Sequence, residues 1–120
     1  MKRALFTFYN LSLDPDIVRL QAEVVKKFNT TADFHPLCSN THGEEVIHPD
    51  AVDYGFNQLF VEEKYDTVLL LDVDCIPLNA YALEYTFEQA EKGKLIGNVQ
   101  RGMHLDNDEH NYVAPSAFCL

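Results

Sequence analysis

Basic residues are scarce in this chain. Nine lysines and arginines stand against nineteen aspartates and glutamates, which gives a formal net charge of −10 over 120 residues. Such a surface repels phosphate polymers, and no basic cluster offsets it, so nucleic-acid binding is disfavoured. A single anionic nucleotide is still compatible with this charge, because a metal ion can lie between protein carboxylates and phosphate groups.

Long apolar segments and paired cysteines are also missing. The apolar run after Met-Lys-Arg is too short for the core of a signal peptide, and no run approaches the length that spans a membrane. Cys38, Cys75 and Cys119 are widely separated and form no CxxC pair, so neither a disulfide framework nor a zinc site is indicated. We therefore expect a protein without a membrane span in a reducing, cytoplasmic setting.

Strand-like and helix-like segments alternate along the chain. Buried strands are expected at residues 4–9, 32–37, 67–71 and 95–99, and helices are expected to begin at Asp14-Pro15, at Pro49 and at Asn79. This order predicts an α/β fold with an open, mostly parallel sheet and helices on both faces. The length predicts one domain, 1–120.

The first helix is expected to turn Ile17, Leu20, Val24 and Phe28 toward the sheet, because they repeat at helical spacing. Residues 100–111 are expected to form a polar loop. The chain then ends on apolar residues, so residues 112–120 are either a docked final strand or part of a longer, incomplete domain.

Two aspartates follow the clearest strand of the sequence. Asp72 and Asp74 come directly after the apolar run at 67–71, where ligands bind in open α/β sheets. Residues two apart on an extended segment point the same way, and two converging carboxylates repel each other unless a cation lies between them. Hard oxygen ligands suit Mg²⁺ or Mn²⁺. The alternative is that the aspartates only end the strand and cap the next turn.

The residues around this pair resemble a known family. Residues 65–79 resemble the D-x-D region of GT-A-type glycosyltransferases, and residues 93–101 resemble the strand that follows it, especially in phage-type members. The resemblance implies a GT-A or Rossmann-like domain that binds a nucleotide sugar. In it, Asp72 and Asp74 would hold Mn²⁺ or Mg²⁺ against the diphosphate of a UDP- or GDP-sugar. The implied reaction transfers the sugar to an unknown acceptor, with the sugar and the stereochemistry left open.

The resemblance also implies that the end of the first strand lies against the nucleotide. Thr7, Tyr9 and Asn10 are therefore candidate nucleotide-sugar-binding residues, together with Asp72. Tyr9 can stack on a base, and Asn10 offers a donor and an acceptor for its edge. The alternative is an aromatic core strand that ends in a turn.

A later histidine often supplies a further metal ligand in GT-A enzymes. His104 and His110 flank a polar stretch and are the candidates for this role, with a solvated acidic loop as the alternative. No catalytic residue is assigned.

Two other functions compete with glycosyl transfer. An apolar strand followed by D-x-D also begins haloacid-dehalogenase-type phosphatases, in which the first aspartate would be the nucleophile. Ile76-Pro77 fits that motif poorly, and no acidic pair ends a later strand. The second alternative is a non-catalytic nucleotide-sugar-binding or structural module of the same fold.

Overall fold

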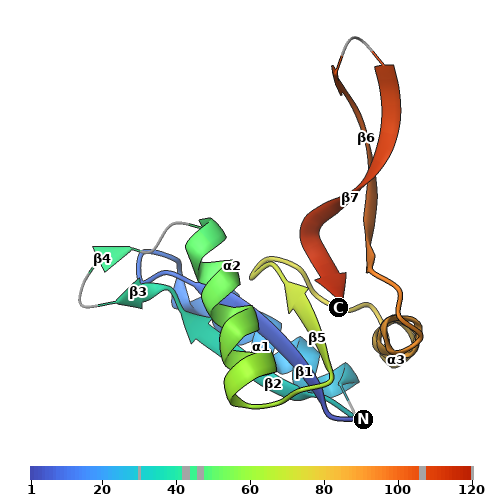
Figure 1. Cartoon of the computed structure of the whole chain (residues 1–120). Helices are drawn as coiled ribbons and strands as arrows, with labels where there is room; N and C mark the ends of the chain where they lie inside the picture. The colour runs from blue at the N-terminus through green and yellow to red at the C-terminus, as the bar shows by residue number, and fades with distance from the viewer. Residues whose placement is uncertain (30, 42–43, 46–47, 106–107, 120) are drawn as a thin grey trace.

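A computed structural model describes residues 1–29, 31–41, 44–45, 48–105 and 108–119, with side chains for residues 1–29, 31–39 and 50–97 (Figure 1). Its elements, in chain order, are β1 (Arg3–Tyr9), α1 (Pro15–Phe28), β2 (Asp33–Cys38), β3 (Asn40–Thr41), β4 (Glu44–Glu45), α2 (His48–Phe56), the π-helix η1 (Asn57–Glu62), β5 (Thr67–Leu71), α3 (Ala80–Glu91), β6 (Ile96–Leu105) and β7 (Asp108–Cys119).

Five of the strands form one open sheet. Their spatial order is β2-β1-β5-β7-β6, and β3 and β4 form a separate antiparallel pair. β1 lies between β2 and β5 and is parallel to both, whereas β7 is antiparallel to β5 and to β6. The prediction of an α/β fold with an open sheet is therefore confirmed, with a parallel part of three strands.

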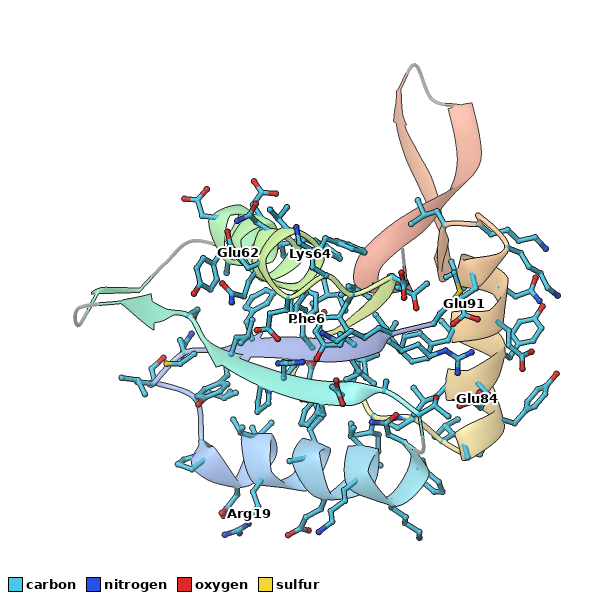
Figure 2. All side chains as sticks on the ribbon, turned by 60° about the horizontal axis from the view of Figure 1, so that its bottom comes forward. Phe6, Arg19, Glu62, Lys64, Glu84 and Glu91 are labelled. Atoms are coloured by element: carbon cyan, nitrogen blue, oxygen red, sulfur yellow. The ribbon has the colours of Figure 1, made fainter. Side chains whose placement is uncertain are left out.

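Helices cover both faces of the parallel strands, as the sequence predicted. On one face, α1 and α3 pack on β1 and β5 through a buried cluster that includes Leu5, Val25 and Phe87. On the other face, α2 and η1 pack through a second cluster that includes Phe6 and Leu59. Figure 2 shows α1 and α2 on opposite sides of the strands, with Phe6 on the side of α2.

β5 is the middle strand of the five-stranded sheet, and all five of its residues are buried. A strand covered on both faces has no solvent side, so its sequence is a continuous apolar run rather than an alternating one. Burial of each leucine in Leu69-Leu70-Leu71 contributes roughly 1.5–3 kcal/mol. Because β5 is buried up to Leu71, Asp72 is the first residue after the strand and lies at the edge of the sheet.

Capping residues set the helix ends near the candidate site. The Asp14 side chain accepts a hydrogen bond from the backbone N–H of Asp16, and Pro15 begins α1. The Asn79 side chain accepts one from the N–H of Ala82 at 2.8 Å and begins α3. Gly93 follows α3 with a φ of 82°, a left-handed conformation that glycine adopts without a Cβ clash. The predicted starts of both helices are confirmed.

The predicted inner face of α1 is correct only at the end of the helix, where Phe28 packs against the core cluster. Of the expected residues, Ile17 is 39% exposed and Leu20 is 56% exposed. The residues of α1 that are buried are Gln21 and Val25. The two faces both carry apolar residues at helical spacing, and contact with the sheet at Val25 selects one of them.

The predicted loop at residues 100–111 is also wrong. β6 continues to Leu105 and β7 begins at Asp108, so the described residues of this stretch, 100–105 and 108–111, belong to the strands of an antiparallel hairpin that projects from the sheet (Figure 1). β7 pairs with β5 only from Ala117 to Cys119, whereas its pairing with β6 extends from Asp108 to Cys119 with two irregularities. The two strands of the hairpin lie outside the layered core and satisfy their backbone hydrogen bonds by pairing with each other, so they need no apolar sequence pattern. Because the polar composition showed no such pattern, it suggested a loop.

Candidate metal and nucleotide site

The segment that follows β5 is a tight turn. The backbone N–H of Cys75 donates to the carbonyl oxygen of Asp72 at 2.9 Å, which closes a turn over residues 72–75. The expectation of an extended segment here is therefore wrong. The turn still brings the side chains together, because it folds the backbone back over four residues.

The turn gathers three side chains with metal-binding atoms. A carboxylate oxygen of Asp72, one of Asp74 and the Sγ of Cys75 all lie within 4.8 Å of one another. Asp72 and Cys75 are half-buried and Asp74 is exposed, so the group opens to solvent on one side. The sequence predicted the acidic pair as metal ligands. It did not predict Cys75, because no second cysteine or histidine stands at metal-ligand spacing from it.

The site carries concentrated negative charge. Burial raises the pKa of the Cys75 thiol, and the charges of Asp72 and Asp74 raise it further. The thiol is therefore protonated at neutral pH, which leaves the two carboxylates as the charged groups of the turn. Such an arrangement attracts a cation.

A buried glutamine on α1 holds the turn. Gln21 is 1% exposed, and its Nε2 donates to the carbonyl oxygens of Asp72 and Cys75, at 2.7 Å in each case. These two carbonyls belong to the first and last residues of the turn. Sequence analysis assigned no role to Gln21, because it considered only the apolar residues of α1.

A pocket of about 360 Å³ lies at the carboxyl end of β1. Its lining is mostly apolar and comes from the end of β1, the following segment, the first half of α1 and β2: Tyr9, Asn10, Leu11, Leu13, Pro15, Val18, Arg19, Ala22 and Pro36. Pockets for small ligands begin at a volume of about 300 Å³ and are mostly apolar with a few polar groups. The pocket and the 72–75 turn therefore lie at the same edge of the sheet, because β1 and β5 are parallel neighbours.

Two of the predicted nucleotide-binding residues line this pocket. The Tyr9 carbonyl accepts hydrogen bonds from the N–H and the hydroxyl of Ser39, which ties the end of β1 to the end of β2. The Asn10 side-chain oxygen accepts from the N–H and hydroxyl of Ser12, and its carbonyl accepts from the N–H of Leu13. These bonds fold residues 10–13 into a turn that forms one wall of the pocket.

The third predicted contact, Thr7, is placed differently. Its side chain is fully buried, and within the described part of the chain its Oγ1 has no hydrogen-bond partner. It is therefore closed off from solvent and does not line the pocket. A role for Thr7 in nucleotide binding stays a prediction.

The two candidate histidine ligands lie on the projecting hairpin. His104 is in β6, and His110 is in β7, where it pairs with Gly102. Their side chains lie outside the described residues. Metal binding by either histidine stays a prediction.

Comparison of the chain with models of protein families, with curated proteins and with solved structures finds no match. Among the described residues, no helix is long and apolar enough to cross a membrane.

Proposed function

We propose that the chain binds a nucleotide-diphosphate sugar together with Mn²⁺ or Mg²⁺, and that it transfers the sugar to an acceptor as GT-A-type glycosyltransferases do. The observation that carries the proposal is the group formed by Asp72, Asp74 and Cys75 at the carboxyl end of β5, the middle strand of the sheet. The pocket at the end of the neighbouring strand supports it.

The donor set fits a hard divalent cation. Two ligands on opposite sides of Mg²⁺ are about 4.2 Å apart, since each Mg–O bond is about 2.1 Å. The ligand atoms of the turn lie within 4.8 Å of one another, so a small rotation of the exposed Asp74 side chain closes the difference. Two carboxylates leave the remaining coordination positions to water and phosphate oxygens, which is the usual arrangement for Mg²⁺ bound with a nucleotide.

The chain's own residues would divide the work between pocket and turn. The apolar pocket beside Tyr9 would hold the flat base and exclude water from its faces. Asp72 and Asp74 would hold the cation at the turn, where its charge would offset their repulsion of the diphosphate. The cation, when bound, would stabilise the negative charge that develops on the departing diphosphate.

Binding of UDP and GDP in the presence and absence of Mn²⁺ tests the proposal. We expect isothermal titration calorimetry to detect one of the two nucleotides with wild-type protein and Mn²⁺, and to show a loss of at least tenfold in affinity without the metal. Asp74→Asn removes one ligand charge and should cause a similar loss.

Asp53→Asn is the matched control, because it removes one negative charge from an exposed position on α2. Equal weakening by both variants would show that general charge, and not the turn, attracts the ligand. Transfer is then measured with sugar donors that carry the nucleotide found to bind. Metal-dependent binding without transfer would identify a non-catalytic module.

A further inference from the structure

We propose that Gln21 is a positioning residue for the metal site, and that its carboxamide sets the shape of the 72–75 turn on which Asp72 and Asp74 stand. This inference rests on the proposed function. It adds a residue from α1 that neither contacts the cation nor belongs to the D-x-D segment.

The hydrogen bonds of Gln21 reach both ends of the turn. Its Nε2 lies 2.7 Å from the carbonyl oxygen of Asp72 and 2.7 Å from that of Cys75. Both donors of one amide group are therefore used on two carbonyls that bracket Asp74 in the sequence. The carbonyl of Asp72 also accepts the N–H of Cys75 at 2.9 Å, so the tether and the turn share one acceptor.

The carboxamide oxygen of Gln21, Oε1, makes no contribution that would explain why a glutamine is buried here. This oxygen is buried and, among the residues that the structure describes, has no hydrogen-bond partner. An unpaired buried acceptor destabilises the folded state, and an apolar side chain of similar volume would avoid that loss. The gain from this residue therefore lies in its two N–H donors and in the carbonyls that they hold.

The helix that carries Gln21 gives the tether a rigid base. α1 is fixed by its cap at Asp14 and by Val25, which lies one turn after Gln21 and is fully buried against the sheet. Groups that hold metal ligands in place from outside the coordination sphere commonly change metal affinity about 10–100-fold when they are removed. We expect loss of the Gln21 tether to fall at the lower end of this range, because it acts through the backbone.

The test compares three variants with wild-type protein. Gln21→Met keeps the approximate volume and removes both donors. Val25→Ala weakens the packing of the same helix without touching the turn, and Thr67→Val alters another buried side chain whose Oγ1 has no partner in the described part of the chain. Thermal unfolding gives the stability of each, and Mn²⁺ electron paramagnetic resonance titrations give the metal affinity.

We expect Gln21→Met to weaken Mn²⁺ binding about tenfold, whereas Val25→Ala and Thr67→Val stay within twofold of wild type. Alkylation of Cys75, followed by peptide mass spectrometry, supplies a readout that needs no metal. Its rate should rise in Gln21→Met beyond the rise in Val25→Ala, because the half-buried thiol loses its fixed turn.

Three results would overturn the inference. Unchanged Mn²⁺ affinity in Gln21→Met, with wild-type binding lost in Asp74→Asn, would leave the proposed function in place and reject Gln21. Equal losses in Gln21→Met and Val25→Ala would show a purely structural effect. Absence of Mn²⁺ binding in wild-type protein would reject the metal site itself, and faster Cys75 alkylation in Gln21→Met would then mark a tether without a metal role.

Discussion

Substitution of Gly55 by alanine tests the packing of α2 on β1. A Cβ at position 55 would lie 2.5 Å from Cε2 of Phe6 and 3.0 Å from its Cζ. Carbon atoms in contact are normally about 3.5–4.0 Å apart, so the overlap is roughly 1 Å. The Phe6 ring cannot move away freely, because it is fully buried and packs edge-on against Phe56 with ring centroids 5.2 Å apart.

The expected cost follows from two opposing effects. An overlap of this size places the strain near the upper end for overpacked cores, about 3 kcal/mol. Replacing glycine by alanine inside a helix returns about 1 kcal/mol. The net loss in the free energy of unfolding is then about 2 kcal/mol, which urea denaturation followed by circular dichroism resolves.

A second background makes the prediction sharper. In Phe6→Val the Cδ2, Cε2 and Cζ atoms that the new Cβ would meet are all absent. Gly55→Ala should then no longer destabilise and should stabilise by up to about 1 kcal/mol. The effect of one substitution thus changes sign with the residue at position 6. If Gly55→Ala costs the same in both backgrounds, the contact between α2 and Phe6 is not as described.

Three further predictions concern ionisable groups. Arg3→Met should destabilise by about 2 kcal/mol at pH 7, a value between those of exposed and buried ion pairs. Because Arg3 lowers the pKa of Glu91, this difference should shrink as unfolding is followed below about pH 4. Burial raises the pKa of Tyr65, and the hydrogen bond that its hydroxyl donates to Asp33 raises it further. The urea concentration at the unfolding midpoint of wild type should therefore decrease above about pH 10, and Tyr65→Phe should remove this decrease. Cys75 should react with iodoacetamide at pH 8 more slowly than the exposed Cys38, and equal rates by peptide mass spectrometry would contradict the raised pKa of its thiol.

The parallel strands and the acidic pair could be predicted because their signals are local. The apolar run Thr67–Leu71 has no alternative as a core strand, and a polar pair after it lies at the sheet edge by topology. The same holds for Asn79, whose side chain caps the next helix through a contact only three residues away.

The role of Gln21 could not be predicted, because it depends on how a helix is rotated against the sheet. Two faces of α1 offer apolar residues at helical spacing, and the sequence pattern favoured the one with Leu20, which is more than half exposed. Selection of the other face depends on contacts with β1 and β5 that are distant in the sequence. A glutamine within an apolar stripe is the signal that could have identified it.

The hairpin of β6 and β7 illustrates a second limit. Antiparallel pairing joins residues such as Val99 and Val113, which are separated by the polar stretch that suggested a loop. β7 then enters the sheet between β5 and β6, a placement that the alternation of strands and helices does not reveal. Pairing across a sheet is a tertiary property, and local composition does not determine it.

The location of the bound cation tests the central claim most directly. Substoichiometric Mn²⁺ added with UDP or GDP to ¹⁵N-labelled protein broadens the amide resonances that lie close to the metal. We predict the strongest broadening at Asp72, Asp74 and Cys75, weaker broadening at Tyr9 and Asn10, and its loss in Asp74→Asn. Broadening spread over the exposed acidic residues of α1 and α2, and unchanged in Asp74→Asn, would contradict a metal site at the end of β5.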